Sequence, residues 1–575
     1  MTNSPSRRAF LAGTGGVLTS AMTGTAATST MSGTAWASAA RGASSLSLPA
    51  KPNFVIILAD DLGWGEIGCY GQKMIKTPHL NRLAAEGLRF TSAYSGAPLC
   101  APSRAALLTG LHTGHTTVRE NPEGGEQHDM SVDDLTFAGL LQMAGYRTAL
   151  FGKWGFGPER PDQPSHPNSR GFDEFFGFID HQHAHQYYPS YLWHNGQKVS
   201  LGRKYYAPDL FLKRAKDFIK RNADEPFLLY FPTILPHSPS VVPDGAGQYE
   251  NKPWTRANRL HAAQVTRLDS HVAQIVQALK DAGVSDSTLV LFISDNGPHR
   301  EKGVTPWLFN SNGPYRADKR DLYEGGIRTP MIAWSPALSR QGEVADEQVA
   351  SWDIMPTLAD LAGLPVPDNL DGISFKGVLD GSGYEGHDLL FWNRPRKAQA
   401  IRRGRWKAVR FAPHIAGAGS DGRFELYDLD NDRGETHNLA KIETGIAAEL
   451  DELMNQSVGP DPRSPYGLRV ASSGPVRYGE PHEFVVTLHN GSAQPWDGVR
   501  LRLEVPSGWR VEGGAERQLL EPGGALRAAF TVTPPAAGGR GRTQRLVPRA
   551  RFAAQGRTVS FQKLRPVKVH QRADV

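Results

Sequence analysis

Cysteine is scarce in this sequence, which holds only Cys69 and Cys100 among 575 residues. So few cysteines exclude a fold that depends on a disulfide framework. A bond between the two would consume Cys100, which lies in a recognisable motif, so we expect both thiols to be free and Cys69 to be buried. Long apolar runs are also missing from the interior of the chain, which excludes a membrane-spanning helix there.

Acidic residues are few at both ends of the chain. Residues 466–575 hold 17 Lys and Arg against 8 Asp and Glu, a net charge of +9, and residues 1–48 hold three Arg and no acid. Since the whole chain carries +6, residues 49–465 carry −6. A basic tail on an acidic body can help to hold a polyanion, and a solvated Arg-rich surface without a ligand is the alternative. We expect no nucleic-acid partner.

The first 41 residues have the features of a targeting segment. Arg7-Arg8 precede Phe10-Leu11 and a weakly apolar stretch, and Ala37-Ser38-Ala39 offers a small-residue cleavage site. Paired arginines in this place are typical of a twin-arginine signal peptide; the alternative is a Sec signal with two chance arginines. Both predict a protein that is exported to the periplasm, the cell surface or the medium.

Strand and helix patterns alternate through the centre of the chain, which at 575 residues is too long for one ordinary domain. Residues 53–58 and 288–293 are continuous apolar runs, typical of strands buried on both faces. Helical periodicity appears at 79–87, 134–144 and 257–282. The alternation predicts an α/β domain over 50–385, with a mostly parallel central sheet flanked by helices. In such sheets chemistry gathers at the carboxyl ends of the strands.

The pattern changes after about residue 385. Antiparallel strands are predicted at 401–411 and 424–429, and a closing helix at 441–456, which together make a small α+β subdomain over 386–459. The proline-rich segment 460–465 predicts a linker.

The last part of the chain, 466–575, consists of short alternating runs separated by Gly, Pro and Asn, which predict an all-β sandwich. Residues 484–490 loosely resemble a strand of the NPCBM-associated modules that are appended to bacterial glycan-active enzymes. That resemblance implies a spacer or docking domain that acts near carbohydrate; a purely stabilising appendage is the alternative.

The segment around Cys100 carries the strongest local signal. It reads Cys100-Ala101-Pro102-Ser103-Arg104 and continues into a helical pattern, and proline suits the first turn of a helix. Cys100 then lies at a helix amino terminus, where free N–H groups favour an anion, and Arg104 lies one turn further on. The sequence therefore predicts a nucleophile-like residue, an anion site and an arginine in one place.

This segment resembles the modification signature of the type I sulfatases, which belong to the alkaline-phosphatase-like superfamily. Over 50–460 further motifs occur in the order of that family: Ala59-Asp60-Asp61, Gly152-Lys153-Trp154, Pro236-His237, Ser294-Asp295-Asn296-Gly297, and Lys319 followed by Glu324-Gly325-Gly326. The resemblance implies an alkaline-phosphatase-like fold and an arylsulfatase-like sulfuric ester hydrolase. It also implies that a formylglycine-generating maturation enzyme oxidises Cys100 to formylglycine.

Two acidic clusters predict a metal site. Asp60 and Asp61 follow one apolar run, Asp295 and Asn296 follow the other, and their oxygen ligands suit Ca²⁺ or Mg²⁺ better than zinc. Each cluster alone is more often a turn or a cap, but their paired occurrence favours a metal. By resemblance the modified Cys100 adds a ligand and the ion is Ca²⁺, with Mg²⁺ as an alternative.

The resemblance further implies a reaction path. A hydroxyl of the hydrated formylglycine, activated by the metal, attacks sulfur and forms a covalent sulfate. Arg104, Lys153 and Lys319 meet the charge on the sulfuryl oxygens, and His237, alone or together with Lys319, assists the departing alcohol. The second hydroxyl is then deprotonated, so sulfate leaves and the aldehyde returns.

One position departs from the common pattern. Many family members place a histidine two residues after the lysine, where this chain has Gly155, so the base for sulfate release is unassigned. His181, His183 and His185 lie nearby and would share one face of an extended segment. We hypothesise that His183 or His185 supplies the imidazole, or that one of the three binds substrate; a polar surface loop is the alternative. Tyr187 and its aromatic neighbours suit either a sugar ring or ordinary packing.

The export signal and the basic tail favour a sulfated carbohydrate, small or polymeric, over an aryl sulfate as substrate. Two other functions stay open. One is a phosphonate monoester or phosphodiester hydrolase of the same superfamily. The other is a non-catalytic glycan-binding relative, against which the intact Cys100, Arg104 and Lys153 argue.

Overall fold

The computed structural model describes most of the chain after the predicted signal peptide. The described residues are 46–122, 127–131, 134–367, 370–395, 397–411, 423–458, 467–472, 476–490, 495–521, 524–536, 543–554, 557–562 and 565–570. The predicted signal peptide at 1–41 and the predicted linker at 460–465 lie outside them. Within these ranges no helix has the length and apolar character needed to cross a membrane.

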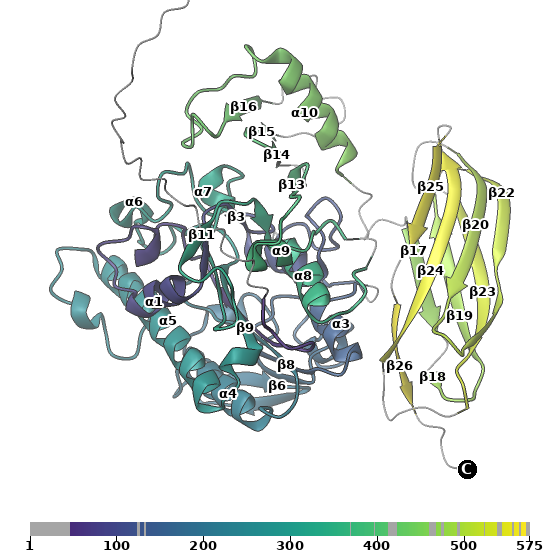
Figure 1. Cartoon of the computed structure of the whole chain (residues 1–575), viewed down its shortest axis with the longest axis horizontal. Helices are drawn as coiled ribbons and strands as arrows, with labels where there is room; N and C mark the ends of the chain where they lie inside the picture. The colour runs from purple at the N-terminus through teal and green to yellow at the C-terminus, as the bar shows by residue number, and fades with distance from the viewer. Residues whose placement is uncertain are drawn as a thin grey trace, which may run out of the picture. The chain divides into compact units, whose positions relative to one another are not determined.

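A ten-stranded sheet forms the centre of the α/β part (Figure 1). Strands β10 and β6 run against the direction of the other eight, so the sheet is mostly parallel, and the predicted α/β class is confirmed. In spatial order the strands are β11 (Glu343–Ala345), β2 (Leu88–Phe90), β10 (Met331–Trp334), β9 (Thr288–Ser294), β1 (Asn53–Ala59), β8 (Phe227–Pro232), β4 (Arg147–Lys153), β5 (Glu174–Phe178), β6 (Tyr191–His194) and β7 (Gln197–Ser200).

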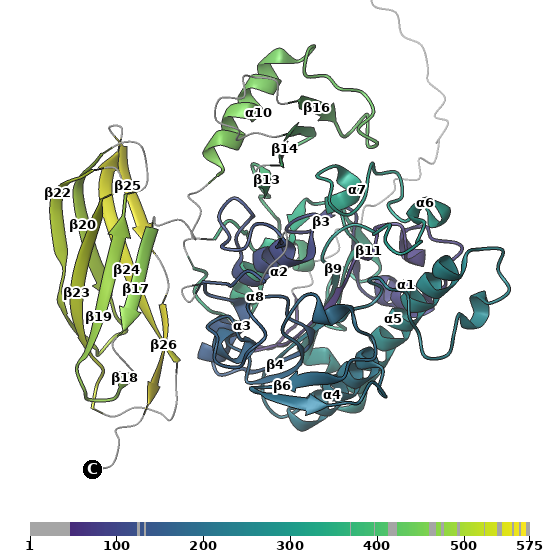
Figure 2. The ribbon, with the colours of Figure 1, turned by 180° about the vertical axis from the view of Figure 1, so that it is seen from behind.

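Helices cover both faces of this sheet (Figures 1 and 2). All seven residues of β1 are buried, because Phe54, Ile56 and Leu58 face one core while Val55 and Ile57 face the other. The first core includes α2 (Cys100–Thr109), α3 (Phe137–Met143) and α8 (Ile354–Leu361). The second includes α1 (Pro78–Glu86), α4 (Ala207–Arg221) and α5 (Arg256–Asp281). A continuous apolar run is what a strand between two helical layers requires.

A small antiparallel sheet follows, with strands β13 (Leu390–Arg394), β14 (Ala398–Arg403), β15 (Trp406–Phe411) and β16 (Phe424–Asp428). Helix α10 (Thr444–Gln456) packs on it through Leu450 and Met454. Buried Lys407 joins this sheet to the α/β part, since its Nζ lies 3.0 Å from Glu324 Oε1 and 2.9 Å from Glu435 Oε1. Glu324, which belongs to one of the family-like motifs, therefore anchors the small sheet to the α/β part.

The carboxyl-terminal strands form a β-sandwich, as the sequence predicts. One sheet has the order β17-β19-β23-β21, the other has the order β18-β26-β24-β20-β22, and β25 pairs with β24. Apolar side chains from both sheets share one core, for example Phe484 and Phe530 from the first and Leu501 and Leu546 from the second. The strands are β17 (Gly467–Ser472), β18 (Val476–Arg477), β19 (His482–His489), β20 (Trp496–Glu504), β21 (Arg510–Gly513), β22 (Ala515–Leu520), β23 (Ala525–Thr533), β24 (Thr543–Ala554), β25 (Arg557–Gln562) and β26 (Arg565–His570).

Candidate active site

Four neighbouring strands deliver the predicted site residues to one edge of the sheet. Asp60 follows β1, Lys153 ends β4, His237 follows β8 by five residues and Asp295 follows β9. The strands are adjacent in the order β9-β1-β8-β4 and run parallel, so their carboxyl ends meet. The apolar runs in the sequence predicted β1 and β9 but not β8, which completes the group.

Cys100 reaches this edge from helix α2. It is the first residue of the helix and is fully buried, with its Sγ atom 3.5 Å from Asp60 Oδ1 and 3.8 Å from Asp61 Oδ1. The helix begins after Leu99, whose backbone is extended, and ends at Gly110, whose φ of 70° closes the last turn. Burial raises the pKa of the Cys100 thiol well above its usual value, so the unmodified cysteine is a poor nucleophile here.

Arg104, one helical turn after Cys100, is also fully buried and binds two elements. Its Nε and Nη2 donate to Asp295 Oδ2 at 3.1 and 2.8 Å, and its Nη1 donates to the backbone oxygen of Lys153 at 2.8 Å. Nη2 also lies 3.4 Å from Asp60 Oδ1. The guanidinium therefore ties the ends of β1, β4 and β9 to the helix that carries Cys100.

Two buried lysines pair with the aspartates that follow β1. Lys153 Nζ donates to Asp60 Oδ2 at 2.8 Å, and Lys319 Nζ donates to Asp61 Oδ2 at 2.7 Å. With Arg104 these lysines supply three positive charges against the three carboxylates of Asp60, Asp61 and Asp295. The pocket is formally balanced, so an added divalent cation would give it a positive charge that favours an anionic ester.

The carboxylates differ in how well these cations stabilise them. Burial alone would raise the pKa of Asp60, but the positive charges of Lys153 and Arg104 hold it well below its usual value. Burial raises the pKa of Asp295, and the nearby charge of Asp60 raises it further. A cation bound between these side chains would stabilise the ionised form of all of them.

The donor set fits a hard divalent cation. Asp60, Asp61, Cys100 and His237 each place one potential ligand atom within 4.8 Å of the others. Asn296 lies beside Asp61, its Nδ2 donating to Asp61 Oδ1 at 2.8 Å, and its own Oδ1 is buried with no hydrogen-bond partner. An unpartnered buried amide oxygen is costly unless it has a ligand, and oxygen donors are those that Ca²⁺ and Mg²⁺ prefer.

His237 approaches the other carboxylate oxygen of Asp61, Oδ2. Its Nδ1 donates to the Ser238 carbonyl oxygen at 2.6 Å, so its Nε2 faces the pocket. That nitrogen lies 3.2 Å from Lys319 Nζ and 3.3 Å from Asp61 Oδ2. Burial lowers the pKa of His237 to about 3, although Asp61 opposes the shift. A neutral imidazole that accepts a hydrogen bond from the Lys319 ammonium fits these contacts.

The three histidines after β5 do not share one face. Residues His183–His185 form a short 3-10 helix, so the predicted extended segment is wrong. The ring of His185 stacks on His237 at 4.6 Å between centroids, and His181 lies 5.0 Å from His185 and 6.4 Å from His237. His181 Nδ1 and His185 Nε2 are buried without a hydrogen-bond partner. Burial, and then the charge of Lys153, lowers the pKa of both rings.

His183 points away from this cluster, because a helical turn rotates its side chain to the other side. Its Nδ1 donates to Glu159 Oε1 at 2.8 Å. The same carboxylate accepts from Tyr191 Oη at 2.7 Å and from Trp193 Nε1 at 2.8 Å. Glu159 thus holds the histidine loop against strand β6. No periodicity or motif marks Glu159 in the sequence.

Two further residues support the loop that carries His237 and the side chain of Lys319. Tyr187 was among the predicted substrate-binding residues, and Glu301 was not predicted. The ring of Tyr187 is buried, and its hydroxyl lies 2.8 Å from the carbonyl oxygen of Ile234 and 2.6 Å from that of His237, so it braces the His237 loop. The Glu301 carboxylate lies 3.5 Å from Lys319 Nζ and accepts from Ser238 Oγ at 2.8 Å.

Gly155 leaves space at the position where the resemblance implied a histidine. A Cβ atom built there would meet only Arg104 Cδ, at 3.8 Å, but φ is 94°, a conformation that residues with a side chain rarely adopt. The backbone here therefore suits glycine, and the space beside Arg104 stays open.

The two cysteines are both free, as expected, but Cys69 is half-buried where the sequence predicted a buried thiol.

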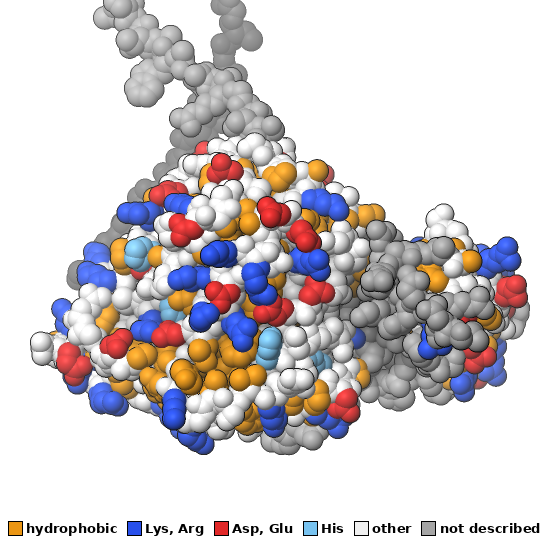
Figure 3. All heavy atoms as spheres, turned by 90° about the horizontal axis from the view of Figure 1, so that it is seen from below, with side chains coloured by type: hydrophobic (Ala, Val, Ile, Leu, Met, Phe, Trp, Pro, Cys, Tyr) orange, Lys and Arg blue, Asp and Glu red, His pale blue; other side chains and the backbone are white. Residues whose placement is uncertain are grey.

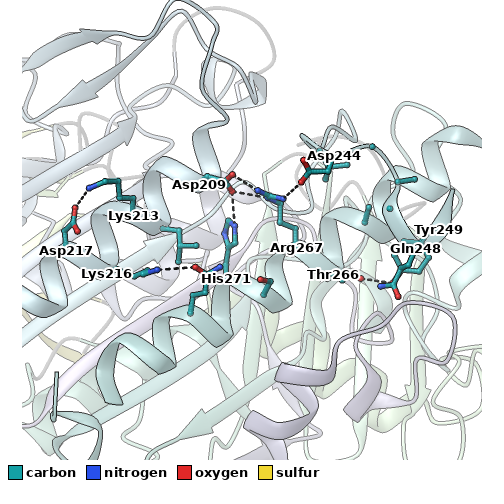
Figure 4. Close-up of a pocket in the computed structure, with 18 residues that line it drawn as sticks. Asp209, Lys213, Lys216, Asp217, Asp244, Gln248, Tyr249, Thr266, Arg267 and His271 are labelled. Atoms are coloured by element: carbon teal, nitrogen blue, oxygen red, sulfur yellow. Dashed lines mark hydrogen bonds and ion pairs between the residues drawn. The ribbon is translucent and has the colours of Figure 1, made fainter. Parts of the chain in front are cut away.

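A hollow of the surface lies outside this cluster, between α4, α5 and residues 242–249 (Figure 4). Its volume is about 640 Å³, and none of the predicted site residues lines it. Arg267 bridges Asp209 and Asp244, and Lys213 pairs with Asp217, so the charged groups satisfy one another. The chemistry-bearing residues are therefore those around Cys100.

Known families match three successive parts of the chain. The Sulfatase family matches residues 52–364, more than half of the chain. The C-terminal part of N-sulphoglucosamine sulphohydrolase matches residues 314–458, and the NPCBM-associated NEW3 domain of alpha-galactosidase matches residues 476–548.

Individual relatives agree with these matches. N-acetylgalactosamine-6-sulfatase of Canis lupus familiaris is 32% identical over 403 residues, which are 64% of this chain and 74% of the relative. Arylsulfatase A of Homo sapiens is 31% identical over 468 residues, 72% of this chain and 88% of the relative. Ps i-CgsB, crystallised in complex with k-i-k-neocarrahexaose, is 30% identical with a TM-score of 0.63 over 72% of this chain and 94% of its own.

A phosphonate monoester hydrolase of Agrobacterium radiobacter has a TM-score of 0.54 at 21% identity over 71% of this chain and 96% of its own, which shows a shared fold alone. The two sulfatase family matches together cover residues 52–458, which include the strand ends, the α2 segment and the subdomain that contains Lys407. The chain belongs to the sulfatase family.

Proposed function

We propose that this sulfatase removes sulfate from a sulfated carbohydrate, with formylglycine at position 100 and a divalent metal beside it. Sulfate ester hydrolysis itself follows from the family, so the chain is an enzyme rather than a non-catalytic glycan-binding protein. The observation that carries the finer proposal is the buried cluster in which Cys100 lies against Asp60 and Asp61. A relative is named for N-acetylgalactosamine 6-sulfate ester cleavage, which supports a sugar sulfate as substrate.

The metal would be held by Asp60, Asp61, Asp295, Asn296 and the modified residue 100. Ca²⁺ is the proposed ion and Mg²⁺ the alternative, because every side chain of this set offers oxygen. When bound, the cation polarises the sulfate oxygens and lowers the pKa of a hydroxyl that coordinates it. Arg104 donates to Asp295 and Lys153 donates to Asp60, and these hydrogen bonds hold the two carboxylates in place.

The protein side chains divide the remaining work between two sides of the pocket. Hydrated formylglycine would present one hydroxyl to sulfur from the amino terminus of α2, where helix N–H groups and Arg104 favour negative charge. Lys153 and Lys319 lie at the aspartates beside it and would meet the charge that grows on the sulfuryl oxygens.

Lys319 and His237 form the leaving-group side of the pocket. The fixed Nδ1–H of His237 leaves Nε2 toward Lys319, so the lysine ammonium is the proton-bearing member of the pair. We propose that this pair stabilises or protonates the departing sugar oxygen, with Glu301 orienting Lys319.

Sulfate release needs a base that removes a proton from the second hydroxyl at position 100. We propose His181 or His185 for this step, because each has a buried, unpartnered ring nitrogen and lies by His237. His183 is set aside, since its Nδ1 is bound to Glu159.

Maturation and export complete the proposal. A formylglycine-generating enzyme would modify Cys100. The amino-terminal pattern supports export by the twin-arginine route and a periplasmic, cell-surface or secreted product.

The decisive measurement is the mass of the peptide that contains residue 100, from protein made together with a maturation enzyme. The proposal expects the mass of an aldehyde in place of the thiol, and Cys100→Ala protein without turnover on sulfated sugars. Cysteine that stays unmodified in turnover-competent protein would refute the formylglycine role. Faster cleavage of phosphonate monoesters or phosphodiesters than of any sulfate ester would refute the substrate class.

The metal is tested separately. Treatment with a chelator should abolish turnover, and titration with Ca²⁺ or Mg²⁺ should restore it and identify the ion. Full turnover after rigorous chelation would remove the metal from the mechanism.

A further inference from the structure

Two adjacent strands of the β-sandwich carry four arginines on one exposed face. In β20, Val499, Leu501 and Leu503 are buried and the residues between them are exposed; β24 alternates in the same way. The pairing register places Arg500 opposite Arg551 and Arg502 opposite Arg549. We call these four residues the arginine block; Figure 1 shows the two strands next to each other.

The block occupies a small area. Neighbouring strands lie about 4.8 Å apart and alternate residues of one strand about 7 Å apart, so the four side chains start from the corners of a compact rectangle. Like charges directly opposite each other destabilise a sheet. The arrangement therefore adds nothing to the stability of the sheet.

Acidic neighbours neutralise only one diagonal of the rectangle. Arg500 pairs with Glu516 of β22 at 3.3 Å, and Arg549 pairs with Glu504 at 2.6 Å. Arg502 and Arg551, on the other diagonal, are exposed and have no ion pair among the described residues. Two outward guanidinium groups therefore remain available to a ligand.

The face of the molecule that Figure 3 presents is arranged differently. On this face Lys and Arg side chains are interspersed with Asp and Glu. In the catalytic pocket each buried cation contacts a carboxylate. The arginine block thus combines same-sign clustering with incomplete neutralisation.

We propose that the arginine block binds a sulfated polysaccharide, so that the sandwich holds the polymer whose sulfate esters the catalytic pocket cleaves. The guanidinium fork matches the oxygens of a tetrahedral oxyanion, and spacings of about 5 to 7 Å suit repeated charges along a polymer better than a single anion. The choice of a sulfated polymer over other polyanions rests on the proposed function.

The test compares two double variants of the full-length protein. In Arg502→Gln/Arg551→Gln the free diagonal loses its charges. Arg510→Gln/Arg527→Gln is the matched control, since it removes two exposed arginines from β21 and β23 in the opposite sheet. Binding is measured by affinity electrophoresis in gels that contain dextran sulfate or uncharged dextran, over a range of salt, with thermal melting to confirm folding.

The proposal expects Arg502→Gln/Arg551→Gln to weaken dextran sulfate binding by about fivefold or more at low salt and to reduce the salt slope by about two. The control should change binding less than twofold, and uncharged dextran should bind neither protein. Equal weakening in both double variants would overturn the proposal, because net charge alone would then explain it. Unchanged binding in the first variant would overturn it as well.

Two readouts separate this inference from the proposed function. Turnover of a small sulfate ester should be the same in both variants and in the parent protein. Duplex DNA that competes with dextran sulfate at equal charge concentration, and loses binding through the same substitutions, would assign the block to polyanions in general and overturn the sulfated polymer. Absence of all sulfatase turnover with binding intact would refute the proposed function and leave the block standing.

Discussion

The catalytic pocket and the arginine block both gather basic side chains, but they treat the charges in opposite ways. In the pocket Arg104, Lys153 and Lys319 are buried, and each lies within 2.8 Å of a carboxylate oxygen. On the sandwich Arg502 and Arg551 are exposed and stand beside other arginines.

The difference follows from solvation. A buried charge without a partner is expensive, so removing one member of a buried pair costs about 3–5 kcal/mol. An exposed charge is solvated whether or not it is paired, and its loss usually changes stability by less than about 0.5 kcal/mol. The ion pairs of the pocket thus hold its side chains in one arrangement, while the exposed arginines of the block can bind a ligand and are screened by salt. Four predictions test this contrast.

The largest effect is expected in the pocket, at Lys319. Lys319→Met removes the ammonium that contacts Asp61 and His237, and it should lower kcat by about 10²–10³-fold because charge on the leaving side loses its partner. The free energy of unfolding should fall by several kcal/mol, measured by urea denaturation. Arg527→Met serves as the exposed control; a Lys319→Met loss of less than tenfold in kcat would contradict the role.

The histidines provide the next test, within one short loop. His181→Ala or His185→Ala should lower kcat by about 10–100-fold, because one of them supplies the base for sulfate release. His183→Ala should affect kcat less, since its ring faces Glu159. Burst kinetics with a chromogenic sulfate would show whether the slow step is release. If neither His181 nor His185 alters the steady-state rate, the base lies elsewhere.

Glu159 should affect the same loop only by holding its side chains in place. Glu159→Gln weakens three hydrogen bonds from His183, Tyr191 and Trp193 and should lower the free energy of unfolding by about 1–3 kcal/mol at pH 7. Burial opposes the shift, but these donors lower the Glu159 pKa from 4.5 to about 2.

A lowered folded-state pKa stabilises the protein above the unfolded value, and that stabilisation is lost as pH falls toward the folded value. The stability difference between the parent and Glu159→Gln should therefore shrink between about pH 5 and pH 2. Urea denaturation across this range measures it. A difference that stays constant would mean that the carboxylate charge contributes nothing.

The smallest effect is expected on the sandwich. Arg502→Gln/Arg551→Gln should change the free energy of unfolding by less than about 0.5 kcal/mol, or raise it slightly, because like charges face each other there. Thermal melting of the full chain at low and high salt measures this. A loss comparable to that of Lys319→Met would mean that the block is structural.

Much of the site was predictable because its residues follow apolar runs or form local motifs. Asp60 and Asp295 follow such runs, and Cys100 opens a helix that a proline in its first turn marks. Lys153 and His237 were found through resemblance, and β8, which leads to His237, was missed although it is a short apolar run. Local patterns could not reveal Glu159 or Glu301, since each acts through contacts with residues far away in the sequence.

The histidine loop shows where local reasoning fails. Histidines at 181, 183 and 185 are compatible with a strand or with a turn of helix. The helical turn is selected by tertiary contacts of His183, which packs on Phe178 and donates a hydrogen bond to Glu159. The selection reverses which histidines face the pocket.

By itself the sequence determined the α/β class, the appended sandwich and the acidic and cysteine motifs, because periodicity and short-range spacing depend on neighbours along the chain. The tertiary structure decided which histidines reach the pocket, which lysine pairs with which aspartate, and which arginines stand opposite one another across β20 and β24. These depend on strand order and register, which are set by the burial of whole layers and not by any local run of residues.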